Sequence, residues 1–431
     1  MTVERRPFDV PAGSNETQTS ELTRRRFLVA GGSTLGSALV APAITARASG
    51  AETSAIRRRV TLGRTEIEVP DISFGTFSLE DNEELVQYAL DRGVTHFDTA
   101  ESYTDGRAEA VLGRALRGRR QEVTITSKFT AGPEDPAEHQ MKVLEESLRK
   151  LGTDYIDIYL NHAVNDVRRL GEEWQRFATL AKEQGKIRAI GLSGHGPRLS
   201  QCMEHALDQN LVDVILVAYN FAQQPSFKEN LKSYLSDWMP DLDIVVSQAR
   251  LPELLKRAHD QGVGVMVMKT LKGARLNDMR RFESPGRTFA QAAFRWVLSD
   301  PSVDGLVVSM TSQAQIDEYL EASGAETPDR EDLALLARYL ARNANTSCVI
   351  GCGDCLDACP AGVSIPDLMR LRMYDVDYGL PKIAAREYAR LEADANPCLA
   401  CSGTPCEGAC PAGLDIARLT RETHRRLIGQ S

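Results

Sequence analysis

The chain has 431 residues, of which 42% are hydrophobic and 26% are charged, and its formal net charge is -9. This composition is typical of a soluble globular protein, and the acidic balance argues against a nucleic-acid partner. The length exceeds one average domain but suits a barrel of about 250 residues followed by a small module. We therefore expect two folded units.

The first 50 residues have the features of an export signal. The segment Thr-Arg-Arg-Arg-Phe-Leu at 23–28 precedes an apolar run to Ala46, and a small-residue cleavage site lies near 46–48. The pattern resembles a twin-arginine signal, which implies export of a folded, cofactor-loaded protein to the periplasm or another extracytoplasmic compartment. The alternative is a disordered basic tail. Gly, Ser and Pro in the apolar run make it a poor spanning helix, so we expect no integral membrane span.

The next 270 residues or so alternate short β-branched runs with helical periodicity, which predicts parallel strands joined by crossover helices. The predicted strands are 71–76, 95–99, 123–129, 155–161, 187–192, 212–219, 263–269 and 305–309. The predicted helices are 82–92, 108–117, 138–151, 167–184, 198–209, 251–261, 287–299 and 313–322. Eight such pairs predict an α/β fold, a (β/α)8 TIM barrel, over residues 57–325.

Three further segments complete the predicted domain organisation. A short hairpin at 58–69 is expected to cap the base of the barrel, and an extra helix is expected within the long segment 223–248. A helix at 331–342 leads into the C-terminal region, so residues 331–431 are expected to form a small, mainly helical domain.

Four ionisable residues follow or end successive predicted strands: Asp98, Tyr103, Lys128 and His162. A TIM barrel presents its catalytic groups at the carboxyl ends of its strands, so these side chains are expected to meet. A lysine within a strand is rarely buried unpaired, and Asp98 is its expected partner. A cation beside a phenol should lower the phenol's pKa and let it donate a proton near neutral pH.

These four residues resemble the Asp, Tyr, Lys, His tetrad of the aldo/keto reductase superfamily, and Gly-Lys-Ile-Arg-Ala-Ile-Gly at 185–191 resembles the family's fifth-strand signature. The resemblance implies that Tyr103 protonates or deprotonates the substrate oxygen. It also implies that Lys128 and Asp98 tune that phenol, and that His162 orients a small carbonyl or alcohol substrate. Taken singly, each residue also has a structural explanation, such as a loop cap, an exposed phenol, an ion pair or a core histidine.

The nicotinamide pocket that the resemblance implies departs from the family pattern. The usual Ser-Asn after strand five is Ser193-Gly194, the carboxamide-binding glutamine falls on Leu216, and the stacking aromatic falls near Lys269.

The basic residues that would bind a 2'-phosphate align with Ser309 and Gln315. Each lost charge-assisted hydrogen bond is worth roughly 1.5 to 3 kcal/mol. The sequence therefore leaves binding of NADP(H) open, with Ser193, Ser309 and Thr311 as the candidate cofactor contacts.

Eight of the nine cysteines lie in two groups within residues 348–410, and each group ends in Cys-Pro. The groups are Cys348, Cys352, Cys355 and Cys359, and Cys398, Cys401, Cys406 and Cys410. The pattern resembles a bacterial two-cluster ferredoxin, which implies two 4Fe-4S clusters in a ferredoxin-type domain, with the fourth cysteine of each group crossing to the other cluster. Both spacings differ from the usual ones, and disulfides or a zinc site are the alternatives.

Two other residues have less specific interpretations. Cys202 lies in a helical segment and is expected to be a small packing residue. His195, between two glycines on the expected catalytic face, either contacts a substrate or phosphate or lies in a surface loop.

Three functions remain open. The first is an exported oxidoreductase that interconverts a carbonyl and an alcohol while two clusters exchange electrons with a protein or quinone partner. The second is an NADPH-dependent carbonyl reductase with structural clusters. The third is an electron-carrier or interaction protein whose barrel serves as a scaffold.

Overall fold

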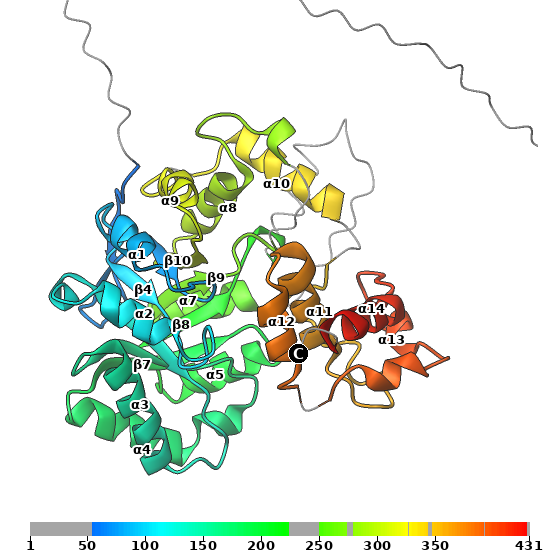
Figure 1. Cartoon of the computed structure of the whole chain (residues 1–431), viewed down its shortest axis with the longest axis horizontal. Coiled ribbons are helices and arrows are strands. Elements are labelled where there is room, and N and C mark those ends of the chain that lie inside the picture. The colour runs from blue at the N-terminus through cyan, green and yellow to red at the C-terminus, as the bar shows by residue number, and fades with distance from the viewer. Residues whose placement is uncertain are drawn as a thin grey trace, which may run out of the picture. The chain divides into compact units, whose positions relative to one another are not determined.

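The computed structural model describes residues 54–223, 250–273, 279–325, 327–343, 347–391 and 393–428 (Figure 1). The predicted signal at 1–50 lies outside these residues, and so do residues 224–248 of the segment 223–248 that was expected to carry an extra helix. The described residues belong to one compact unit.

Eight parallel strands close into a barrel, in the order β10-β3-β4-β5-β6-β7-β8-β9. The strands are β3 (Ile72–Gly75), β4 (His96–Asp98), β5 (Thr124–Phe129), β6 (Ile156–Asn161), β7 (Ile187–Gly194), β8 (Val214–Ala218), β9 (Gly264–Met268) and β10 (Gly305–Ser309). Strand β7 passes close to β8 at Gly191, where an added Cβ would lie 1.8 Å from the carbonyl oxygen of Val214. The eight predicted strands and the (β/α)8 architecture are thus confirmed.

The predicted hairpin is also present, as β1 (Arg59–Thr61) paired antiparallel with β2 (Glu68–Pro70). Its apolar residues Leu62, Ile67 and Val69 pack into the barrel against inward-facing strand residues that include Leu216. This burial closes one end of the barrel, and the other end, where the strands finish, is left for the site.

The crossover helices follow the prediction closely. They are α1 (Glu83–Leu90), α2 (Ala108–Ala115), α3 (Ala137–Leu151), α4 (Glu172–Glu183), α5 (Leu199–Asp208), α7 (Leu251–Asp260), α8 (Phe289–Leu298) and α9 (Gln313–Leu320). Short 3-10 turns are η1 (Arg120–Glu122), η2 (Val167–Leu170), η3 (Phe221–Gln223), η4 (Arg280–Phe282) and η6 (Asn396–Leu399). The single helix predicted at 167–184 is wrong, because extended backbone at Gly171 divides it into η2 and α4. Thr288 caps α8 through a reciprocal capping box with Gln291.

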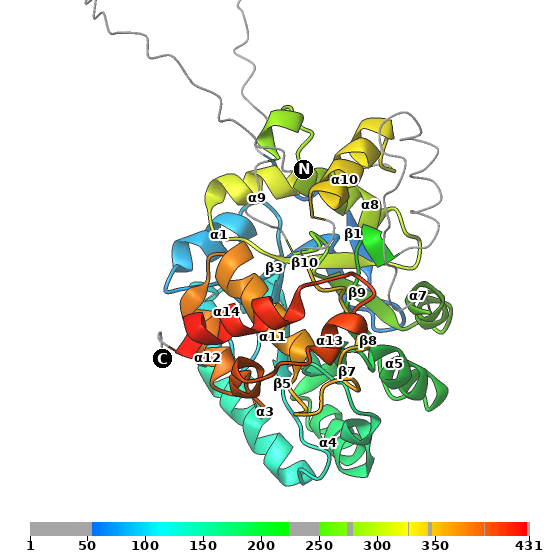
Figure 2. The ribbon, with the colours of Figure 1, turned by 90° about the vertical axis from the view of Figure 1, so that its right-hand side faces the viewer.

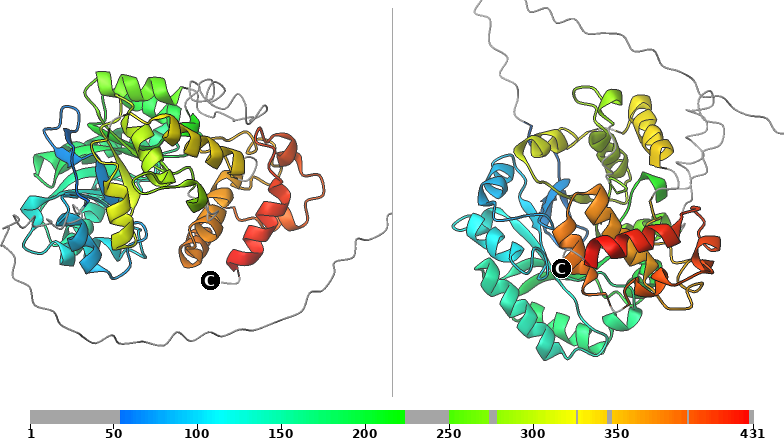
Figure 3. Two further views of the ribbon diagram at one scale, coloured as in Figure 1. Left: turned by 90° about the horizontal axis from the view of Figure 1, so that it is seen from above. Right: turned by 45° about the vertical axis from the view of Figure 1, so that its right-hand side comes forward.

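The C-terminal region is mainly helical. Its elements are α10 (Arg330–Asn343), α11 (Ile365–Arg372), the π-helix η5 (Met373–Asp377), α12 (Pro381–Tyr388), α13 (Pro405–Gly408) and α14 (Ile416–Ile428). Helix α10 packs against α8, and α11, α12 and α14 share a small apolar core with the cysteine loops. Figures 2 and 3 show these helices beside the barrel, with α11, α12 and α14 lying across it when they face the viewer.

None of the described helices combines the length and the hydrophobicity that crossing a bilayer requires.

Candidate active site

The four predicted tetrad residues lie together at the carboxyl ends of β4, β5 and β6. Lys128 is 1% exposed, and its Nζ donates to Asp98 Oδ1 at 2.6 Å, to the Thr99 carbonyl at 2.7 Å and to the Tyr103 hydroxyl at 3.3 Å. The ring of His162 stands edge-on to that of Tyr103, with the centroids 5.6 Å apart. The arrangement therefore brings a phenol, an ammonium and an imidazole close together at the carboxyl ends of these strands.

The protonation states follow from burial. Burial raises the pKa of Tyr103 well above its ordinary value, and the negative charges of Asp98 and Glu387 raise it further. The expectation that Lys128 would lower this pKa is therefore wrong, because desolvation of the phenolate outweighs the neighbouring ammonium. Since Lys128 donates to the phenolic oxygen, the phenol's own hydrogen remains available for a group in the cavity.

His162 is neutral at ordinary pH. Burial lowers its pKa well below the usual value, and the positive charges of Lys128, Arg169, Arg370 and Lys269 lower it further. A neutral imidazole can donate one hydrogen bond to a carbonyl oxygen, but it does not supply a proton in this range.

The tetrad lines a cavity of about 770 Å³, which lies within the size range of small-molecule and cofactor sites. The three predicted cofactor residues Ser193, Ser309 and Thr311 line the same cavity. Ser193 Oγ accepts a hydrogen bond from the Ala163 amide at 3.2 Å, and Thr311 is held by Gln315 through a 2.7 Å bond from its amide. The structure thus brings the predicted catalytic and cofactor residues to one chamber.

Two of the departures from the family pattern take different places in the structure. Leu216 is buried in the barrel interior with the hairpin and does not line the cavity. Lys269 follows β9 directly, lines the cavity and has a φ of 58°.

His195 is half-buried and lines the cavity too, so the surface-loop alternative for it is wrong. Cys202 is fully buried, as a packing residue would be.

The C-terminal helices supply part of the cavity wall, which the sequence did not reveal. Asp367, Arg370 and Tyr374 line it from α11 and η5, and Glu387 lines it from α12. In the sequence, positions 367, 370 and 374 are spaced three and four residues apart, which places their polar side chains on one face of a helix. This spacing was the sequence signal from which a C-terminal contribution to the cavity wall could have been predicted.

Phe77 joins the two regions, because its ring contacts Tyr103 at 5.2 Å and Tyr374 at 5.1 Å between centroids.

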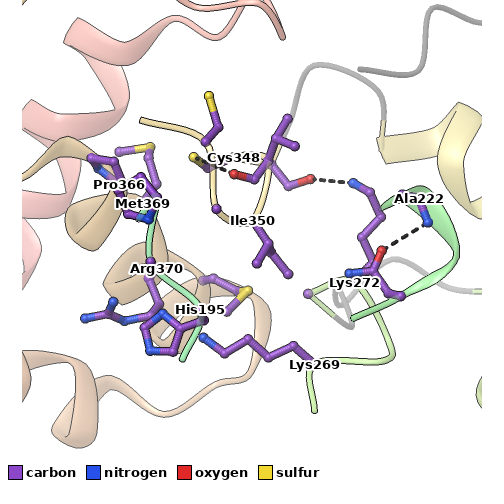
Figure 4. Close-up of a pocket in the computed structure, with 18 of the residues that line it drawn as sticks. His195, Ala222, Lys269, Lys272, Cys348, Ile350, Pro366, Met369 and Arg370 are labelled. Atoms are coloured by element: carbon purple, nitrogen blue, oxygen red, sulfur yellow. Dashed lines mark hydrogen bonds between the residues drawn. The ribbon is translucent and has the colours of Figure 1, made fainter. Parts of the chain in front are cut away.

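The first cysteine loop packs directly against the barrel. Cys348 and Cys352 line a small cavity of about 80 Å³ together with His195, Lys269 and Arg370 (Figure 4). An added Cβ on Gly353 would lie 2.8 Å from Pro197 Cβ, so the loop and the barrel are in close contact there.

The cysteine side chains fall into two sets. Burial raises the pKa of Cys348 to about 12, and the neighbouring thiols of Cys352, Cys355 and Cys410 raise it further. Cys410 thus lies near the first group.

In the second set, burial raises the pKa of Cys398, and Cys359 and Cys401 contribute to the rise. Burial also raises the pKa of Cys406, where Glu407, Cys359 and Cys398 contribute.

All nine cysteines are free thiols. Among the described residues, no three Cys, His, Asp or Glu side chains are gathered tightly enough to form a metal site. The two 4Fe-4S clusters, and a zinc site, therefore stay predictions.

Comparison with known proteins concerns the barrel. The Aldo/keto reductase family profile matches residues 60–339 and ends before Cys348. L-glyceraldehyde 3-phosphate reductase of Escherichia coli O157:H7 is 26% identical over 316 residues, covering 65% of this chain and 91% of that protein. L-galactose dehydrogenase of Arabidopsis thaliana is 24% identical over 278 residues, covering 61% and 86%. The structure of an aldo-keto reductase from Klebsiella pneumoniae in complex with NADPH has 25% identity and a TM-score of 0.50, covering 66% of this chain and 95% of that one.

Proposed function

Because this chain belongs to the aldo/keto reductase family, we propose that it is an exported oxidoreductase that interconverts a small carbonyl compound and an alcohol, and that two iron-sulfur clusters connect it to an electron-transfer protein or a quinone. The oxidoreductase class follows from the family. The observation that carries the catalytic assignment is the hydrogen-bonded set Asp98, Lys128 and Tyr103, with His162 beside it, on a cavity of cofactor size.

In this proposal the substrate oxygen lies between Tyr103 and His162. The neutral imidazole donates a hydrogen bond that orients the carbonyl, and the phenol gives its proton to the oxygen as negative charge develops there. Lys128 stabilises the resulting phenolate, since its ammonium already contacts the phenolic oxygen at 3.3 Å. Asp98 fixes the position of that ammonium through the 2.6 Å ion pair.

NADP(H) fits the cavity in part. Ser193, Ser309 and Thr311 offer polar contacts, and Thr270 Oγ1 is a buried cavity-lining atom without a hydrogen-bond partner in the described part of the chain. When bound, the nucleotide supplies or accepts the hydride at the substrate carbon. The similarity to a protein that binds NADPH supports this assignment.

The cysteine loops offer the donor chemistry of an iron-sulfur module, because all eight of their cysteines are free thiols and neighbouring thiols raise the pKa of Cys348, Cys398 and Cys406. The Leu414 amide donates to Cys410 Sγ at 3.5 Å, a type of contact that also tunes cluster sulfur. Arg421 holds the second loop by donating to the carbonyls of Cys398 and Cys401. Bound clusters would supply one-electron exchange. The contact of the Cys348 loop with residues of the cavity wall supports the proposal that a cluster held there exchanges electrons with the active site.

An anaerobic cofactor inventory of protein recovered from the exported fraction tests the proposal. We expect about eight iron atoms per chain with equivalent sulfide, and cluster reduction when an alcohol substrate is added. Zinc or disulfides in their place would refute the cluster assignment, and protein confined to the cytoplasm would refute export.

The second candidate is an NADPH-dependent carbonyl reductase with structural clusters, which the NADPH-bound relative favours. Stopped-flow mixing with NADPH and an aldehyde separates the two. Hydride transfer that leaves the clusters oxidised and unchanged by an external electron donor would support this second function.

A further inference from the structure

Lys269 and Arg370 lie together at the wall of the tetrad cavity. Lys269 comes from the barrel, directly after β9, and Arg370 comes from α11 of the C-terminal region. Both side chains also line the small cavity beside Cys348, where Figure 4 shows them near His195. The positive charges of both lower the pKa of His162, after the larger effects of burial and of nearer cations, so they are close to the catalytic end of the cavity.

Lys269 differs from the other cations of this cavity in its surroundings. The others each have a carboxylate partner: Lys128 with Asp98, Arg370 with Asp367, Arg386 with Asp105 and Arg390 with Glu387. Within the described ranges of the chain, Lys269 makes no ion pair. Burial and the positive charge of Arg370 lower the pKa of Lys269 well below its usual value, and Asp367 only partly opposes this shift. An anion bound beside Lys269 would therefore stabilise its charged form.

The backbone supports a specific role for this lysine. Its φ of 58° is in the left-handed region, which costs a residue with a Cβ on the order of 1 to 2 kcal/mol. Such conformations persist where the surrounding structure holds them, and they cluster at ligand sites. Here the residue with that conformation lines the cavity, near the position where the family resemblance places an aromatic residue.

We propose that Lys269 and Arg370 bind an anionic group of the substrate, a carboxylate or a phosphate ester, while Tyr103 and His162 act on its carbonyl. This inference rests on the proposed oxidoreductase function and names its substrate class. Arg370 offers a planar guanidinium that matches such an anion, and Lys269 adds a point charge beside it. Because Arg370 belongs to the C-terminal region, that region completes the substrate site as well as carrying the cysteines.

A pair of aldehydes of equal chain length tests the inference with the full-length protein and NADPH. Succinic semialdehyde carries a carboxylate and butanal does not. The measurement is the ratio of their kcat/KM values. We expect the wild-type protein to prefer succinic semialdehyde, and the change Lys269→Met or Arg370→Met to lower that ratio roughly 10- to 100-fold, the loss of one charge-assisted hydrogen bond. Lys269→Arg retains the charge and should keep most of the preference.

Lys256→Met is the matched control, because it removes a lysine from the exposed face of α7, where Lys256 pairs with Asp260. Its ratio should equal that of the wild-type protein. Calorimetry with succinate adds a measurement that does not depend on turnover, and we expect binding to the wild-type protein that Lys269→Met abolishes.

The outcomes separate this inference from the proposed function. If neither aldehyde is reduced, the reductase proposal fails, and succinate binding alone decides the anion site. An unchanged ratio in both variants, or equal succinate binding by wild type and Lys269→Met, overturns the inference. If Lys269→Met instead weakens NADPH binding and keeps the ratio, these cations hold a nucleotide phosphate and the substrate class is wrong.

Discussion

Replacing Lys128 by methionine tests whether the tetrad is held by a buried ion pair. The substitution keeps much of the apolar stem and removes the ammonium that contacts Asp98, the Thr99 carbonyl and Tyr103. Asp98 is 3% exposed, and its Oδ2 already has no hydrogen-bond partner among the described residues. The variant therefore leaves a buried carboxylate without the cation that balances it.

Breaking a buried pair by removing one partner typically costs about 3 to 5 kcal/mol, and we expect a loss of that size in the free energy of unfolding at pH 8. The double variant Lys128→Met with Asp98→Asn should recover most of the lost free energy of unfolding, since neither member of the pair then carries a charge.

The loss should also depend on pH. Burial raises the pKa of Asp98 even in the wild-type protein, where Lys128 opposes the rise. Without Lys128 the pKa rises further, so the folded variant binds a proton that the unfolded chain, with a pKa of about 3.9, has released. Its stability therefore falls as pH rises between these two pKa values, and the deficit relative to wild type should be smaller at pH 5 than at pH 8.

Urea unfolding followed by circular dichroism at both pH values measures this deficit. A loss below about 1 kcal/mol that is the same at pH 5 and pH 8 would show that Asp98 does not depend on Lys128, and it would refute the assignment of a buried charged pair.

Three further predictions concern catalysis and the contact between barrel and C-terminal region. Tyr103→Phe should lower kcat for carbonyl reduction by about 10² to 10⁴, measured as NADPH oxidation, and an unchanged rate would favour the scaffold function. Because the pKa of Tyr103 is raised and that of His162 is lowered, the rate of carbonyl reduction should not change through titration of either group between about pH 6 and 9. A bell-shaped dependence of that rate on pH, centred in this range, would contradict these protonation states. Gly353→Val places side-chain atoms against Pro197 and should increase protease sensitivity of the C-terminal region. Gly408→Ala is the control that should not, because outside its own helix no atom of the described residues lies within 4 Å of the added Cβ.

Much of the arrangement of the tetrad was predictable because, in a parallel barrel, strands that follow one another in the sequence are neighbours and end at the same face. Residues that end successive parallel strands meet at one face, so Asp98, Lys128 and His162 could be placed together before any contact was known. The ferredoxin resemblance likewise implied that Cys359 and Cys410 cross between the two cysteine sets, and this pairing stays a prediction. Hydrophobic periodicity also located the eight strands, since buried parallel strands read as short apolar runs.

Other features were settled only by tertiary structure, because they depend on desolvation and on contacts between distant segments. The pKa of Tyr103 rises because folding buries the phenol at the cavity wall and brings Asp98 and Glu387 near it, whereas the sequence showed only the opposing lysine. Nothing in the order of residues placed Arg370 beside Lys269, since about 100 residues separate them and only packing of α11 on the barrel joins them. The sequence by itself determined the barrel fold and predicted which groups would react, and packing decided the direction in which burial shifts their pKa values and the C-terminal contribution to the cavity.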